Sequence, residues 1–221
     1  MKILLFGGTF DPPHNGHIHN LTAAIEAVRP DKAIVMPAGV PPHKTPSTTP
    51  GERRLAMCEC FKAVSPIVEI SDWELKQEGE SYTINTLEML QETYPGAELY
   101  LAIGSDMLES FTKWRRWQDI LAKATLVVQG RGTDADAVVR KCVVALEYCH
   151  GRVISVPTEP LRCASSDIRT GRVPVSELPE LLPPDVLDQI KKEKLYNIYK
   201  WEGEPRNEVR AGEETGQEES E

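Results

Sequence analysis

Three glycines and two histidines lie within eleven residues near the start of the chain, in the stretch GGTFDPPHNGH (residues 7–17). His14 and His17 are three residues apart, so at the start of a helix both imidazoles lie on one face. Gly7 and Gly8 carry no side chains, and their backbone amides can lie against a bulky anion. The N–H groups at a helix N-terminus add a partial positive charge at the same place. Together these residues predict a phosphate-binding site with imidazole donors.

Two other interpretations of the histidine pair are open on these residues alone. The pair could be ordinary loop histidines, or it could bind zinc, as in a metal-dependent hydrolase. A zinc site needs three or four protein ligands, and the pair supplies only two. None of the five cysteines (58, 60, 142, 149 and 163) forms a CxxC pair. Phosphate binding is therefore the favoured interpretation.

A second glycine pattern, GRGTDA (130–135), follows a predicted strand and precedes a predicted helix. It fits Gly-x-Gly-x-x-Ala, the dinucleotide fingerprint, which would make the chain a non-catalytic dinucleotide-binding regulatory module. That fingerprint normally occupies the first strand–helix turn, and an acidic residue should close the next strand, whereas Glu159 stands at the wrong distance. We interpret the pattern as a tight glycine turn.

The elements that must position these residues alternate along the chain. Short apolar runs predict strands at 2–6, 32–39, 67–70, 98–104, 125–129 and 152–157. Amphipathic stretches predict helices at 17–28, 52–64, 82–94, 111–124, 134–149 and 183–196, with a short helix in SSDIRTG (165–171). Such alternation predicts an α/β fold: one doubly wound, mostly parallel sheet in a single domain, residues 1–200. Ligands of such sheets bind beyond the carboxyl ends of the strands, so the loop after the first strand is the first candidate.

The net charge of −9 is concentrated at the end of the chain. Residues 202–221 hold eight Glu and two Arg, a net charge of −6. A segment so acidic and so poor in apolar residues cannot offset its ordering entropy, so we expect residues 201–221 to be a disordered acidic tail. The rest of the chain is nearly neutral, which argues against nucleic acid as a partner.

No apolar run approaches the length of about 18 residues that a membrane span requires, and no basic leader precedes a long apolar stretch. The odd, scattered cysteines do not form a disulfide framework. We therefore expect a cytoplasmic protein that does not bind membranes. The sequence does not decide the oligomeric state, and a homo-oligomer is compatible with it.

The opening stretch resembles the signature of the nucleotidyltransferase superfamily whose hallmark is His-x-Gly-His, here His14-Asn15-Gly16-His17. In its full form, GGTFDPPHxGH, it is similar to one branch, the bacterial nicotinate-nucleotide adenylyltransferases. The resemblance implies a Rossmann-like nucleotidyltransferase fold. It also implies that His14 and His17 are catalytic, contacting the ATP phosphates and stabilising the transition state of adenylyl transfer.

Four further segments resemble the motifs of that branch, in the same order: PPHK (41–44), SYTINTL (81–87), IGSDMLESFTKWRRW (103–117) and CASSDIR (163–169). The resemblance implies an ATP-binding set of Gly8, Thr9, Phe10, His14, His17, Gly104, Asp106, Ser165, Ser166 and Arg169. It implies a substrate-binding set of Lys44, Thr86 and Trp114. The chain departs from the usual pattern at Asn85, Cys163, Ala164 and Ser166, where the family has Asp, Ile, Ser and Thr.

The activity implied is transfer of AMP from ATP to the phosphate of nicotinate mononucleotide, giving deamido-NAD and pyrophosphate in NAD biosynthesis. The partners expected are ATP and nicotinate mononucleotide, with Mg²⁺ entering with ATP and no tightly bound organic cofactor or protein-bound metal. The substrate's phosphate oxygen is already an anion, so no protein nucleophile or general base is required. Main-chain N–H groups and the Thr86 hydroxyl would favour the acid over the amide, and Trp114 would stack on the pyridine ring.

The nearest rival within the superfamily is a phosphopantetheine adenylyltransferase. Its opening usually has Thr-Asn-Gly-His, and the SYTINTL segment (81–87) argues against it.

Overall fold

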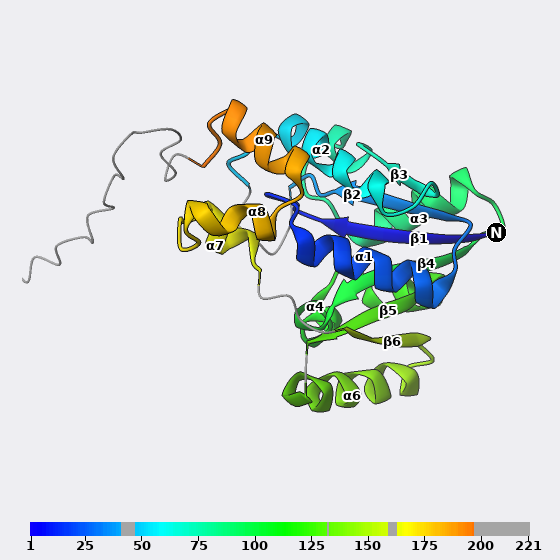
Figure 1. Cartoon of the computed structure of the whole chain (residues 1–221). Coiled ribbons are helices and arrows are strands. Elements are labelled where there is room, and N and C mark those ends of the chain that lie inside the picture. Colours follow the sequence, from blue (N-terminus) through cyan, green and yellow to red (C-terminus); the bar gives the residue numbers. More distant parts are fainter. Residues whose placement is uncertain (41–46, 132, 159–162, 197–221) are drawn as a thin grey trace, which may run out of the picture.

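The computed structural model describes residues 1–40, 47–131, 133–158 and 163–196, and in these residues one six-stranded sheet forms the centre of a single α/β domain (Figure 1). The strands are β1 (Lys2–Gly8), β2 (Lys32–Pro37), β3 (Val68–Ile70), β4 (Glu98–Gly104), β5 (Ala124–Arg131) and β6 (Val153–Thr158). Every neighbouring pair is parallel, in the order β3-β2-β1-β4-β5-β6. The predicted doubly wound fold is therefore confirmed, and the order reverses between β1 and β4, where such folds bind ligands.

Helices connect the strands and cover both faces of the sheet. The α-helices are α1 (Asn15–Val28), α2 (Gly51–Met57), α3 (Thr83–Thr93), α4 (Ser105–Glu109), α5 (Trp117–Lys123), α6 (Thr133–Tyr148), α7 (Ser165–Arg169), α8 (Leu178–Leu181) and α9 (Pro184–Lys192). The 3₁₀ turns are η1 (Cys58–Ala63), η2 (Glu74–Lys76), η3 (Phe111–Lys113) and η4 (Val175–Glu177). Within the described residues, no helix combines the length and the apolar character needed to cross a membrane.

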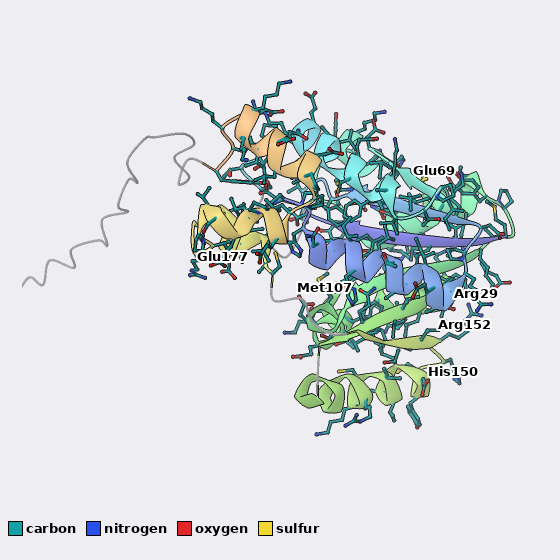
Figure 2. The ribbon with its side chains drawn as sticks, viewed as in Figure 1. Arg29, Glu69, Met107, His150, Arg152 and Glu177 are labelled. Atoms are coloured by element: carbon teal, nitrogen blue, oxygen red, sulfur yellow. The ribbon has the colours of Figure 1, made fainter. Side chains whose placement is uncertain are left out.

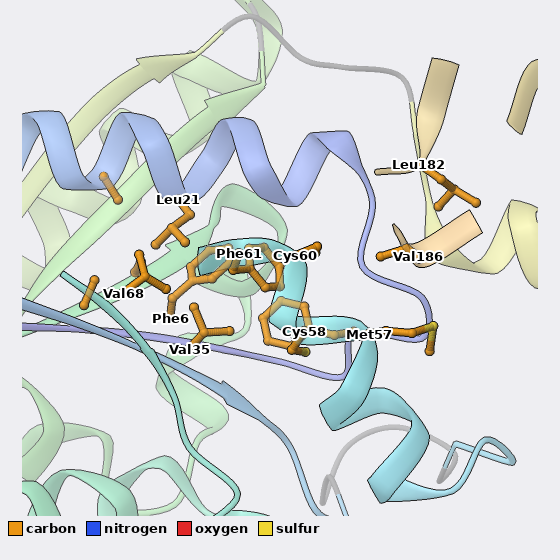
Figure 3. Close-up of a cluster of buried hydrophobic side chains, with 14 of the residues drawn as sticks. Phe6, Leu21, Val35, Met57, Cys58, Cys60, Phe61, Val68, Leu182 and Val186 are labelled. Carbon is orange, nitrogen blue, oxygen red and sulfur yellow. The ribbon is translucent and has the colours of Figure 1, made fainter. Parts of the chain in front are cut away.

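Side chains alternate along β1 between two apolar clusters on opposite faces of the sheet. Leu4 and Phe6 belong to the first cluster, which α1, the α2–η1 segment, α8 and α9 complete. Figure 3 shows part of it, with the ring of Phe6 edge-on to that of Phe61 at 5.9 Å between centroids. Ile3 and Leu5 belong to the second cluster, which α3, α4, α5 and α6 complete. Because both faces are covered, the strands appear in the sequence as continuous apolar runs.

Two predicted helices are divided. The segment 52–64 is α2 followed by η1, and 111–124 is η3 followed by α5. Arg116 explains the second break, because its φ of 55° lies in the left-handed region, which a continuous α-helix cannot contain. The sequence predicts a helix over 183–196, but the helix in the structure ends at Lys192. Tyr196, at the end of the predicted range, has a positive φ of 60°.

Figure 2 shows which labelled residues lie at each end of the sheet. Met107 of α4 lies toward the carboxyl ends of the strands, whereas Arg29, His150 and Arg152 lie at the opposite end (Figure 2).

The GRGTDA stretch falls at the end of β5 rather than of β1, and its Gly132 lies outside the described residues. The predicted acidic tail, 201–221, also lies outside them.

Candidate active site

A cleft of about 1260 Å³ opens at the carboxyl ends of β1 and β4. It is larger than the sites of typical small ligands, about 300–1,000 Å³, so it has room for two substrates. Its walls include most of the residues predicted from the sequence: Gly8, Thr9, Phe10, His14, His17, Gly104, Asp106, Trp114, Ser165, Ser166 and Arg169. Lys44 lies outside the described residues. Thr86 is fully buried and does not line the cleft.

The loop after β1 is held in place by Phe10. This residue has a φ of 49° and its side chain is buried, with ring centroids 5.1 Å from Phe61 and 5.2 Å from His17. A Cβ on Gly8 would lie 2.9 Å from the Phe10 ring, so glycine is needed here for packing as well as for the approach of a ligand. Because the Phe10 side chain is in the core, any contact it makes with ATP falls to its backbone.

His14 and His17 form a stacked pair at the N-terminus of α1, with ring centroids 3.7 Å apart and planes inclined by 25°. The His14 backbone N–H donates to Nδ1 of His17 (3.2 Å), and the His17 N–H donates to Nδ1 of His14 (3.3 Å). Because both Nδ1 atoms accept, each neutral ring carries its proton on Nε2. The first turn of α1 contains no acidic residue, so no carboxylate there offsets the positive end of the helix dipole.

The segment around α7 closes the cleft beside this loop. Ser165 donates to the Pro12 carbonyl (2.8 Å), and Arg169 Nη1 donates to the Asp11 carbonyl (2.6 Å). The N-cap of α7 is Ala164, which supplies no side-chain hydrogen bond to the helix. The two motifs that the sequence places about 150 residues apart therefore meet through direct hydrogen bonds.

The far wall comes from β4, η3 and the N-terminus of α3. Gly104 ends β4, and a Cβ there would lie 2.5 Å from Oδ1 of the exposed Asp106. Trp114 lines the cleft and packs on Phe111 at 5.3 Å, whereas Trp117 packs on Phe111 from elsewhere, at 6.5 Å, and is not part of the cleft wall.

Sequence reasoning missed several residues of this wall. Ser81, Tyr82 and Thr83 bring the N-terminus of α3 into the cleft, and this helix has no side-chain cap. Arg115 also lines the cleft, with its guanidinium 4.5 Å from the centroid of the Tyr82 ring. The helical pattern of SYTINTL was the signal for the α3 terminus, but the pattern alone did not show which end of the helix faces a ligand.

Glu74 is a further residue that sequence reasoning missed, and its hydrogen bond to Thr86 explains why Thr86 does not line the cleft. The Thr86 hydroxyl donates to Glu74 Oε1 (2.6 Å), so Thr86 reaches the cleft only through this carboxylate, which does line it. Burial raises the pKa of Glu74, while hydrogen bonds from Thr86 and the Gly39 backbone act in the opposite direction. The sequence around Glu74 carries no motif that marks it.

Comparison with known proteins agrees with this architecture. The fold and the histidine pair define a nucleotide-binding α/β protein, and residues 5–171 match the family model described as cytidylyltransferase-like. A relative from Clostridium tetani, named as a probable nicotinate-nucleotide adenylyltransferase, is 34% identical, covering 88% of this chain and 98% of its own. One of the same name from Acidithiobacillus ferrooxidans is 35% identical, covering 88% and 95%. The chain belongs to the nicotinate-nucleotide adenylyltransferase family.

A solved structure supports the fold. Plasmodium falciparum nicotinic acid mononucleotide adenylyltransferase, complexed with NaAD, superposes with a TM-score of 0.72, covering 89% of this chain and 97% of its own. At 18% identity, this likeness concerns the fold.

Proposed function

We propose that this chain transfers the adenylyl group of ATP to the phosphate of nicotinate mononucleotide, forming deamido-NAD and releasing pyrophosphate. The observation that carries the proposal is the stacked His14–His17 pair at the N-terminus of α1, inside a cleft large enough for both substrates. The names of the relatives support the same reaction. The reaction is placed in the cytoplasm, in keeping with five unpaired cysteines.

The reaction needs no nucleophile from the protein. A phosphate oxygen of the mononucleotide attacks the α-phosphorus of ATP, a new P–O bond forms, and the bond to the β-phosphate breaks, so pyrophosphate leaves with its electron pair. Aligning the two anions contributes about 7–11 kcal/mol in favourable cases. The Nε2–H groups of His14 and His17 donate to the oxygens on which negative charge grows, and one such donor contributes about 2.7–4 kcal/mol.

ATP lies along β1, α1 and α7. Arg169 supplies a fixed positive charge for the phosphates, Ser165 and Ser166 supply hydroxyls, and Asp106 accepts from a ribose hydroxyl. Mg²⁺ arrives as part of the ATP substrate, since it is commonly bound through nucleotide phosphates. The described residues contain no group of three or more His, Cys, Asp or Glu side chains that could hold a metal ion.

The mononucleotide lies along the far wall. Trp114 stacks on its pyridine ring, and the nicotinate carboxylate accepts from main-chain N–H groups at the N-terminus of α3, beside Thr83. Thr86 supports this binding site through Glu74 and does not contact the mononucleotide, because its hydroxyl already donates to the Glu74 carboxylate. A carboxylate accepts such donors with both oxygens and an amide with only one, so the enzyme prefers the acid.

The test is pyrophosphate release from Mg·ATP with a panel of acceptors: nicotinate mononucleotide, nicotinamide mononucleotide, phosphopantetheine and water. We expect rapid release with the first and much slower release with the second. Release with phosphopantetheine would establish the rival transferase, and release with water alone a hydrolase. Nucleotide binding without any release would favour the regulatory module.

A further inference from the structure

A buried carboxylate that the proposed mechanism does not use lies behind the ATP side of the cleft. Asp11 is 2% exposed. Its Oδ2 accepts from the Ser47 hydroxyl (2.7 Å), and its Oδ1 accepts from the hydroxyl of Tyr196 (2.8 Å). Arg169 is bound to it twice, through Nε at 3.6 Å from Oδ2 and through Nη1 to the main-chain carbonyl at 2.6 Å. Asp11 thus joins the loop after β1 to three distant parts of the chain.

The charges in this cluster explain why the hydroxyls are needed. A buried carboxylate is costly unless its charge is paired and its oxygens are hydrogen-bonded. Arg169 balances the charge, but 37% of its side chain remains exposed, and the residue lines the cleft. The pKa of Tyr196 is raised by burial and by the Asp11 carboxylate, so the phenol keeps its proton and donates at neutral pH.

The short segment after α9 places this hydroxyl next to Asp11. Leu195 is buried in the first apolar cluster, and its N–H donates to the Ile190 carbonyl of α9 (3.0 Å). Lys194 has a positive φ of 50°, which ends the helix direction after α9, and Tyr196 has one of 60°, with its hydroxyl on Asp11. The Thr49 side chain contacts the same phenol, so Tyr196 is held from two sides.

We propose that Tyr196 is a positioning residue for ATP: it occupies one oxygen of Asp11, so that Asp11 holds Arg169 with its guanidinium facing the cleft. Without the phenol, Oδ1 of Asp11 loses its donor inside the protein. The carboxylate then turns to the cation with which it is already paired, Arg169, and draws the guanidinium away from the phosphates. This inference rests on the ATP-binding half of the proposed function and is independent of the acceptor.

The test is the dissociation constant of Mg·ATP, measured by titration calorimetry on the full chain without mononucleotide. Tyr196→Phe should weaken binding on the order of tenfold. Tyr148→Phe, at an 89% exposed tyrosine on α6, is the matched control and should leave binding unchanged. In steady-state assays, the KM for the mononucleotide should stay within twofold of the parent value.

A double-mutant cycle separates positioning from general loosening. In an Arg169→Ala background, Tyr196→Phe should change ATP binding by less than twofold, because the residue through which it acts is gone. An equal loss in both backgrounds, or a loss below threefold in the parent, overturns the proposal. If Tyr196→Phe does not fold, Ser47→Ala, which removes the other hydroxyl from the same carboxylate, is tested by the same criteria.

The outcome is distinct from that of the proposed function. A protein that shows this coupling but releases no pyrophosphate with nicotinate mononucleotide would lose the proposed reaction and keep the role of Tyr196. A parent protein that does not bind Mg·ATP overturns both.

Discussion

Two carboxylates lie in opposite walls of the cleft and are held in different ways. On the ATP side, Asp11 is paired with the guanidinium of Arg169 and also accepts from two hydroxyls. On the mononucleotide side, the groups that hold Glu74 are neutral: the hydroxyl of Thr86 and the Gly39 backbone. One carboxylate is paired with a positive charge that lines the cleft, whereas the other is hydrogen-bonded to the buried Thr86 of α3.

This difference matches the two ligands. A triphosphate requires fixed positive charge, which the proposed function assigns to Arg169 and the helix N-terminus. A pyridine carboxylate requires a flat aromatic surface and a few aligned donors, which the proposed function assigns to Trp114 and the start of α3. The histidine pair also lines the cleft, and the proposed function assigns it to the step that both substrates share.

The largest effect on turnover is therefore expected at His17, because the proposed role of its imidazole concerns both substrates and not one wall of the cleft. His17→Ala should lower kcat by about 10²–10³-fold, since a donor to the developing charge is lost. Both KM values should change little. His150→Asn, at the opposite end of the sheet, is the control and should retain full turnover (Figure 2). Near-normal kcat in the His17 variant would remove the imidazole from the mechanism.

Trp114 tests the mononucleotide wall on its own. Trp114→Ala should raise the KM for nicotinate mononucleotide by about tenfold or more, because stacking on a base contributes about 1–3 kcal/mol. The KM for ATP should stay near the parent value. Trp114→Phe keeps an aromatic surface and should recover most of the loss. Equal changes in the two KM values would show that the walls are not separate.

The parts of this site that were predictable from sequence are those whose signal is local. The glycines and histidines of GGTFDPPHNGH lie in one short stretch, and their residue types alone indicated an anion site. The fold followed from the alternation of strand and helix patterns. By contrast, α4 is five residues long, shorter than a periodic pattern can reveal, and the break at Arg116 depends on one backbone angle.

The parts that were not predictable depend on contacts between distant segments. Tyr196 is 185 positions from Asp11, and no spacing or periodicity connects them. Thr86 has a residue type suited to ligand binding, but Ile84, Leu87 and Leu90 place that side of α3 in the core. Its hydroxyl therefore meets Glu74, which only the folded chain brings near.

Glu74 gives a smaller, more selective effect than Trp114. Glu74→Gln replaces one acceptor oxygen by an amide donor, so one of the neutral donors around it loses its partner. We expect the KM for the mononucleotide to rise on the order of fivefold, with the KM for ATP unchanged. Thr86→Val removes the strongest of these hydrogen bonds and should give a similar change. Glu92→Gln, at an exposed carboxylate on α3 that does not line the cleft, is the matched control. If ATP binding weakens equally, Glu74 supports the whole cleft rather than one wall.

The smallest effect is on stability, and it has a defined sign. Because the pKa of Glu74 is raised above its ordinary value of 4.5, the folded protein holds this proton more tightly than the unfolded chain does. The contribution of Glu74 to stability is therefore greatest below pH 4.5 and declines as the pH rises through the raised pKa, above which it is constant. Glu74→Gln cannot titrate, so the difference in unfolding free energy between parent and variant should shift toward the variant over that interval. Urea unfolding of both proteins across pH 4 to about 8 measures this difference. A difference that is flat with pH, or that shifts toward the parent, would mean that the neutral donors outweigh burial and that Glu74 is already ionised at acid pH.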